Sequence, residues 1–175
     1  MNNVFKNRLG WAVPTAFAAI ALVVALPVAA LELVFSGPAE LTASRSESLT
    51  SIRLPTGPFS ADSLPTQQTE GALEMAAFRV ELKNGSTLDL MRSLRGQVEE
   101  AGFALTFECE TEVCGGYDFR YGITVLPEPD MHVNLGDFRY LAAQGQDGVA
   151  LALLVSRTGN IGFAQRFRRG RLKAF

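Results

Sequence analysis

Histidine and cysteine, the side chains that most often perform catalysis or hold metal ions, are scarce in this sequence. Its 175 residues include one histidine, His132, and two cysteines, Cys109 and Cys114. A zinc site needs three or four clustered ligands, which one histidine beside an oxidised cysteine pair would not supply. The motifs G-x-S-x-G and H-E-x-x-H, which mark two hydrolase classes, are absent. We therefore expect no metal and no cofactor.

Few acid–base candidates remain. His132 would have to serve a hydroxyl as its base and be oriented by an acid, Asp130 or Asp137. Glu128 and Asp130 form a carboxylate pair, but they lie in a proline-rich turn, where solvation is the simplest interpretation. We expect no catalytic residue and hence no enzyme. A hydrolase built on His132 with Asp130 or Asp137 is the alternative left open.

Positive charge is scarce in the body of the chain. Between Leu31 and Gln165 there are nine basic against 18 acidic residues, a net charge of −9, whereas five of the last ten residues are Lys or Arg. An acidic body argues against nucleic acid as a partner. Such a balance is ordinary for an exported soluble protein.

The first 30 residues have the three parts of a secretory signal. Two basic residues precede an uninterrupted apolar run over residues 16–26. Small residues, Val28 and Ala30, then stand at positions −3 and −1 of a cleavage site before Leu31. We expect residues 1–30 to be a signal peptide that delivers the mature chain to the periplasm or the outer membrane.

A retained leader is the alternative. Residues 11–30 are mostly apolar and just long enough to span a bilayer, so an uncleaved leader would act as a membrane anchor. The ending Pro27–Ala30 fits a peptidase site better than a helix end. No cysteine lies near the cut, which excludes lipoprotein processing. Membrane contact is therefore expected only through the leader, and only if it is not removed.

Alternating apolar residues predict several short strands. We expect strands at 31–37, 49–54, 74–83, 103–110, 138–144, 149–158 and 161–167. Residues 38–68 are rich in Ser, Thr and Pro and, apart from the strand 49–54, are expected to be loop. Arg45, Arg53 and the Ser and Thr residues around them are expected to be solvated; a phosphate site is the alternative. Residues 117–126 are expected to form a strand or an aromatic-rich crossing, and Gly145–Gly148 a hairpin turn.

A single main helix is predicted between the strands. Ser86 or Thr87 caps its start, Asp89 completes a capping box, and Gly102 stops it. Its apolar stripe comprises Thr87, Leu90, Met91, Leu94, Val98 and Ala101. This order predicts a single α+β domain over residues 31–165, with a mainly antiparallel sheet and one principal helix packed on one face. We expect residues 166–175 to be a basic tail, disordered or produced by truncation.

The two cysteines are expected to form a disulfide. An even number of cysteines in an exported chain indicates pairing, and the spacing of Cys109 and Cys114 is not the C-x-x-C of a thiol oxidoreductase. Cys109 ends the strand 103–110, in which Phe103, Leu105, Phe107 and Cys109 are expected to share one face. The bridge would fix the end of this strand.

Aromatic and arginine residues alternate on either side of the proline-rich turn. The set that could bind a ligand comprises Tyr117, Arg120, Tyr121, His132, Arg139 and Tyr140. In the simpler interpretation the aromatic rings of this region, with Phe119 and Phe138, point inward and the arginines outward. In the functional interpretation they line a groove in which arginine binds a carboxylate or a sugar-peptide ligand.

Two stretches of this region resemble a known domain. They read GFALTFEC-x4-CGGYDFRY and LPEPDMHVNLGDFRYLAA. They resemble the N-terminal domain of OmpA-family envelope proteins of Gram-negative bacteria, chiefly alphaproteobacteria, over residues 31–165. In that family an exported α+β domain with a short cysteine loop precedes a peptidoglycan-binding domain. The resemblance implies no established activity.

This chain departs from that pattern at its C-terminal end. The peptidoglycan-binding domain is absent, and RFRRGRLKAF follows Gln165. No peptidoglycan-contacting residue can therefore be carried over, and the chain is either a natural short form or a truncated one. The expected function is that of a non-enzymatic envelope protein that contacts envelope proteins or cell-wall material. A periplasmic ligand-binding module is the alternative.

Overall fold

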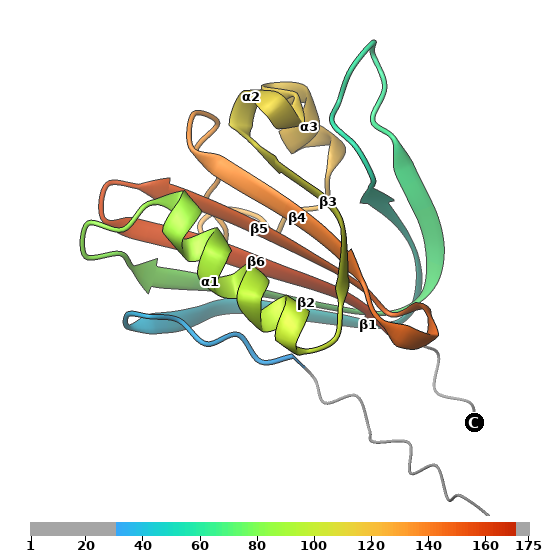
Figure 1. Ribbon diagram of the computed structural model, residues 1–175, viewed down its shortest axis with the longest axis horizontal. Helices are drawn as coiled ribbons and strands as arrows, with labels where there is room; N and C mark the ends of the chain where they lie inside the picture. The colour runs from blue at the N-terminus through green and yellow to red at the C-terminus, as the bar shows by residue number, and fades with distance from the viewer. Residues whose placement is uncertain (1–30, 171–175) are drawn as a thin grey trace, which may run out of the picture. The chain divides into compact units, whose positions relative to one another are not determined.

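The computed structural model describes residues 31–170, so the expected leader and the last five residues of the basic tail lie outside the described part. The described chain forms a six-stranded antiparallel sheet with the order β1-β2-β6-β5-β4-β3 (Figure 1). Its strands are β1 (Ala39–Pro55), β2 (Thr66–Glu81), β3 (Ala104–Glu110), β4 (Phe138–Gln144), β5 (Ala150–Thr158) and β6 (Ile161–Gly170). Within residues 31–170 no helix is long and apolar enough to cross a membrane.

Strands dominate this fold more than the sequence pattern predicted. The expected antiparallel sheet is confirmed, and so is the hairpin that joins β4 to β5. Helical residues are divided among α1 (Thr87–Glu100), the short α2 (Thr111–Cys114) and α3 (Gly116–Gly122), and a 3-10 turn, η1 (Gln146–Gly148). Figure 1 shows α1 lying across one face of the sheet.

Each face of the sheet carries its own hydrophobic core. Successive side chains of a strand point to opposite faces, so the apolar run of β5 serves both. Leu151, Leu153 and Val155 pack with α1, whereas Ala152 and Leu154 pack with the residues around the disulfide. We call these two surfaces the α1 face and the disulfide face.

The helix α1 begins and ends as the sequence predicts. The backbone N–H of Asp89 donates to Ser86 Oγ (3.1 Å), and that of Ser86 donates to Asp89 Oδ2 (2.9 Å), which completes the capping box. Gly102 follows with φ of +83°, which suits glycine. The buried residues are Thr87, Leu90, Met91, Leu94 and Val98. Ala101, the last residue of the predicted stripe, is exposed.

Residues 31–37 do not form the expected strand. They run as an extended segment beside α1, which we call the N-terminal strap (Figure 1). Its alternate residues, Leu31, Leu33 and Phe35, are half-buried against the α1 face. The Gln97 side chain donates to Val34 O and accepts from Val34 N, both at 2.8 Å. The apolar alternation of residues 31–37 therefore reflects burial against the α1 face. The backbone of the strap, however, forms hydrogen bonds with the Gln97 side chain instead of with the backbone of a neighbouring strand.

The long hairpin of β1 and β2 was mostly missed. The expected strand 49–54 lies within β1, but β1 also includes residues 39–48 of the expected loop, and only residues 56–65 connect the two strands. Residues of β1 are polar on both faces over most of its length, so the period-two pattern is hidden, and Arg45 and Arg53 are exposed on the strand instead of in a loop. The register shifts between Leu41 and Ala43 and between Glu47 and Thr50.

A register shift also corrects the prediction for β3. Leu105 pairs with Ala143 and Phe107 with Ala142, so one extra residue lies between them on β3. Because a single extra residue reverses the alternation, Phe103 and Leu105 belong to the core of the α1 face, whereas Phe107 and Cys109 belong to the core of the disulfide face. The four residues therefore do not share one face.

The domain boundary predicted after Gln165 is too early. β6 continues to Gly170 and pairs with both neighbouring strands: Arg166 lies opposite Ala76 of β2 and Leu153 of β5. Residues 166–170 are therefore part of the sheet and not of a disordered tail.

Candidate functional site

The region around the two cysteines contains most of the predicted site residues. Cys109 at the end of β3 and Cys114 at the end of α2 form the expected disulfide, with their Cα atoms 5.1 Å apart. Both cysteines are buried. We call residues 109–122, which include α2 and α3, the disulfide segment.

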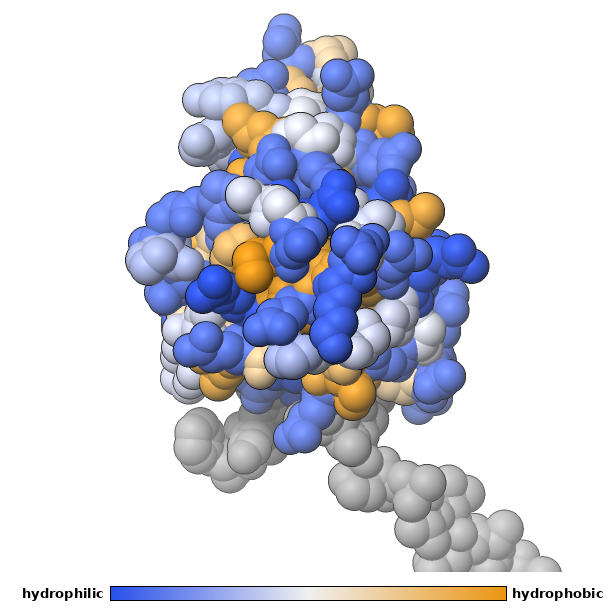
Figure 2. All heavy atoms as spheres, turned by 90° about the vertical axis from the view of Figure 1, so that its left-hand side faces the viewer, coloured by the Kyte–Doolittle hydropathy of each residue, from blue (hydrophilic) through white to orange (hydrophobic). Residues whose placement is uncertain are grey.

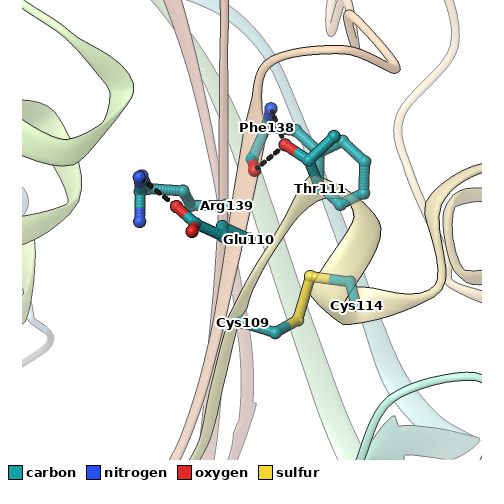
Figure 3. Close-up of a disulfide and its surroundings, with 6 residues drawn as sticks. All are labelled: Cys109, Glu110, Thr111, Cys114, Phe138 and Arg139. Carbon is teal, nitrogen blue, oxygen red and sulfur yellow. Dashed lines mark hydrogen bonds and ion pairs between the residues drawn. A yellow bond between two sulfur atoms is a disulfide. The ribbon is translucent and has the colours of Figure 1, made fainter.

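Thr111 links this segment to the start of β4. It is β-branched, yet its φ is +33°, a conformation that such residues rarely adopt. Its hydroxyl donates to Phe138 O (3.2 Å) and accepts from Phe138 N (3.4 Å), which extends the β3–β4 ladder by one side-chain pair. In Figure 3 these bonds and the disulfide lie apart from the ion pair of Glu110 and Arg139, which belongs to the α1 face.

The loop of the β1–β2 hairpin supports the other side of the segment. Its tip rises beside α2 and α3 in Figure 1. Phe59 N donates to Cys114 O (2.7 Å), and Phe59 lies so close to Gly115 that a Cβ there would come within 2.6 Å of it. A Cβ on Gly122 would come within 2.7 Å of Leu64 in the same way. These two glycines let the loop dock.

Residues 117–121 form part of helix α3, not the predicted strand or crossing. A helix places residues four apart on one side, so Tyr117 and Tyr121 lie together with ring centroids 4.4 Å apart. Phe119 points the opposite way and is fully buried against Tyr140 (5.1 Å between centroids). The Arg120 guanidinium carbon lies 5.3 Å from the Tyr121 ring centroid.

The outer surface of the segment exposes one large aliphatic and two aromatic side chains. Val113, Tyr117 and Tyr121 are 65%, 60% and 65% exposed. Tyrosine and arginine are enriched at protein interfaces. The disulfide, the Thr111 bonds and the docked loop hold this surface in a fixed position, which lowers the entropy cost of binding to it. The candidate site is therefore the surface of Val113, Tyr117, Arg120 and Tyr121.

Two predicted members of the binding set lie elsewhere. Tyr140 is buried in the core of the disulfide face, and its hydroxyl has no hydrogen-bond partner among the described residues. Burial raises its pKa because the phenolate would be desolvated. Arg139 follows the opposite alternation on β4, points to the α1 face and pairs with Glu110. The sheet itself therefore separates Arg139 from Tyr140.

His132 is also apart from the tyrosine pair. Its Nδ1 lies 2.7 Å from Glu128 Oε1, and its ring packs on Phe163 at 5.4 Å between centroids. Glu128 is four residues away in a solvent-exposed segment. This arrangement is a local side-chain pair that fixes residues 128–132 against β6.

Asp137, one of the two acids proposed to orient His132, is engaged in a different network. Its Oδ1 accepts from Thr87 Oγ1 (2.6 Å), and its Oδ2 accepts from Arg157 Nε (2.9 Å). Arg157 Nη1 also donates to Gly85 O (3.2 Å). These bonds tie the first turn of α1 to β5. Among residues 31–170 no group of three or more His, Cys, Asp or Glu could hold a metal ion.

The opposite end of the sheet presents a different surface. Figure 2 shows the side that carries the β2–α1 and β5–β6 turns. Hydrophilic residues cover most of it, and hydrophobic residues show between them in a few places, the largest near the centre.

Sequence reasoning missed Val113 and the packing roles of Gly115 and Gly122. A signal was available for the glycines, since CGGYDFRYG contains three in nine residues. Their contacts with Phe59 and Leu64 join positions more than 50 residues apart in the chain, which no local pattern reveals. Comparison with protein-family models and with curated proteins finds no match for this chain.

Proposed function

We propose that this chain is a non-enzymatic exported protein of the cell envelope, whose surface of Val113, Tyr117, Arg120 and Tyr121 contacts envelope proteins or cell-wall material. In this proposal it is an α+β domain with α1 as its principal helix, related to the N-terminal domain of OmpA-family proteins. The disulfide of Cys109 and Cys114 carries the argument. Such bonds persist in oxidising compartments, and this one holds the exposed aromatic surface.

The arrangement of the acid–base candidates supports contact over catalysis. His132 pairs with Glu128, while Asp137 binds Thr87 and Arg157, so His132 and this acid of the hydrolase alternative serve separate structural pairs. A general base must reach the proton that it removes. The tyrosine pair, in contrast, presents its rings to solvent from a braced segment.

Site-specific photo-crosslinking in intact cells tests the contact surface. A photoreactive phenylalanine analogue at Tyr117 should give specific adducts with an envelope component, because the ring is exposed and rigidly held. The matched control places the analogue at Leu88, an exposed residue of α1. Equal adducts at both positions, or none at Tyr117, would contradict the proposed surface. N-terminal sequencing of the same material should begin at Leu31.

A periplasmic ligand-binding module is the second candidate, and the contact of Arg120 with Tyr121 favours it. A planar guanidinium beside an aromatic ring can bind a carboxylate while the ring covers a sugar or peptide. Co-sedimentation with purified cell-wall sacculi tests whether the ligand belongs to the cell wall: the wild-type protein should sediment, and the double variant Tyr117→Ser, Tyr121→Ser should not. Sequencing the DNA beyond the codon of Phe175 tests the OmpA-family relation. A peptidoglycan-binding domain encoded there in another reading frame would support it.

A further inference from the structure

A hollow of about 520 Å³ lies on the α1 face, between the N-terminal strap and the edge strand β1. This volume is within the range of sites that bind small molecules or single side chains with their backbone. Its walls come from the strap, β1, β2 and β6. We call it the strap groove. It lies on the opposite face of the sheet from α2 and α3, so it is independent of the function proposed above.

Short side chains in one cross-strand row create the hollow. Ser44 of β1 lies opposite Ala76 of β2, and Ala76 lies opposite Arg166 of β6. The next row in one direction contains Leu41 and Phe78, both large. The row in the other direction ends with Arg168, which pairs with Glu74 (3.4 Å). Ser44 and Ala76 are therefore a low point between an apolar row and a charged row.

Arg166 is the long side chain of this middle row. It is half-buried, and burial lowers its pKa because the guanidinium is partly desolvated. Its Nη1 donates to Leu31 O of the strap, and its Nε is buried without a partner among the described residues. Arg45 and Arg168 pair with Glu47 and Glu74. Within residues 31–170, Arg166 has no ion-pair partner, and its observed acceptor is a backbone carbonyl.

The strap shows which chemistry this surface accepts. It is an extended peptide whose alternate residues point inward, and Phe35 packs on Phe78 with 5.1 Å between ring centroids. Arg166 donates to one of its carbonyls. The groove runs beside the strap on the same face and shares Leu33 and Arg166 with it. Its charged lining residues, Arg45 and Arg166 with Glu32 and Glu74, balance, which suits a peptide better than a strongly charged ligand.

We propose that the strap groove binds a second extended peptide segment of alternating apolar residues. One apolar side chain lies over Ser44 and Ala76, and a backbone carbonyl or a carboxylate of the segment accepts a hydrogen bond from Arg166. Pockets for alternate side chains beside a strand are a common way for proteins to recognise peptides. An acyl chain with a carboxylate head is the competing ligand class, and the experiment distinguishes the two.

The probe is a synthetic peptide that copies residues 31–37, acetylated and amidated, titrated into the purified exported protein and followed by calorimetry. Ser44→Phe should weaken binding at least ~10-fold, since the ring fills the hollow. The matched control is Ser48→Phe, an exposed position of the same strand that does not line the groove, and its affinity should stay within about twofold of wild type. Both serines are exposed, so both variants should fold, as melting curves will verify.

Arg166→Gln provides a second test that leaves the hollow open. It should also weaken peptide binding about 10-fold, whereas Arg169→Gln, on the other face of β6, should not. Saturable binding lost in Ser44→Phe and Arg166→Gln supports the proposal. No saturable binding, equal loss in the control variants, or binding of dodecanoate but not of the peptide would overturn it. Gln97→Ala, which loosens the strap, should leave affinity unchanged; a large gain would mean that the peptide replaces the strap.

Discussion

The α1 face is covered mainly by one regular helix of 14 residues, with the N-terminal strap beside it. The disulfide face is covered by helices of four and seven residues and by segments without regular structure. A long amphipathic helix buries one continuous stripe and satisfies its own backbone. Short helices cannot, so the disulfide face depends on other restraints: the bridge, the Thr111 hydroxyl and the docked loop 56–65. The regular helix α1 is held by its continuous apolar stripe, whereas the short helices are held by a disulfide and by individual hydrogen bonds.

Removing one large, fully buried side chain on each face is the strongest test of this comparison. Phe119→Ala should lower the free energy of unfolding by about 3–5 kcal/mol, because a buried aromatic ring leaves a cavity. Leu94→Ala on α1 should cost about 2–5 kcal/mol. Denaturant unfolding gives both values. Hydrogen exchange should then rise first in α2, α3 and residues 56–65 for Phe119→Ala, and first in α1 for Leu94→Ala. Identical exchange patterns would mean that the two faces do not behave separately.

Removing the disulfide should have a smaller effect, confined to one face. In the wild type the bridge closes a short loop and so restricts the unfolded chain. The double variant Cys109→Ser, Cys114→Ser lacks this restriction, so its free energy of unfolding should be lower by about 2 kcal/mol. Amide exchange should increase around Phe59, whose N–H donates to Cys114 O, and not in α1. Alkylation of the native protein without reductant should modify no thiol. Two modified thiols would contradict the bridge as a permanent restraint.

The helix cap on the α1 face should matter less again. Ser86→Ala removes the side-chain cap of α1 and should cost about 1 kcal/mol. Hydrogen bonds from Ser86 lower the pKa of Asp89. A lowered pKa in the folded state contributes stability above the ordinary value of 3.8, and this contribution is lost as the pH falls through the folded-state value. The difference between wild type and Ser86→Ala should therefore shrink below pH 3.8. A difference that grows in acid would contradict this assignment.

The same contrast explains what could be predicted from the sequence. The start and end of α1, the β4–β5 hairpin and the disulfide follow from local signals: a capping box, two glycines in a turn, and an even cysteine count. The β1–β2 hairpin was missed because polar residues on both faces hide the period of two. Thr106 cannot be identified as the extra residue of β3 without its partner strand, since only pairing with β4 defines a bulge.

The residues of the candidate site also divide into those that local sequence indicates and those whose positions depend on the pairing of strands. Tyr117 and Tyr121 belong to the predicted binding set and are exposed, whereas the simpler interpretation of the sequence turned their rings inward. The two rings lie together because they are four residues apart in helix α3, not because they alternate along a strand. Tyr140 and Arg139 were grouped with them by sequence proximity. Their positions on β4 place them on opposite faces, and neither reaches the tyrosine pair.

The smallest effect on stability should come from the residues that carry the proposed contact. In Tyr117→Ser, Tyr121→Ser the free energy of unfolding should change by no more than about 0.5 kcal/mol, because both rings are exposed and contact mainly each other. The same variant should abolish the crosslinked or sedimented complex. Phe119→Ala, on the buried side of the same helix, is the converse control, since it lowers stability without removing an exposed ring. If the tyrosine variant unfolds as readily as Phe119→Ala, the two rings stabilise the disulfide face and are not available for a partner. A stable variant that loses the complex assigns the rings to recognition.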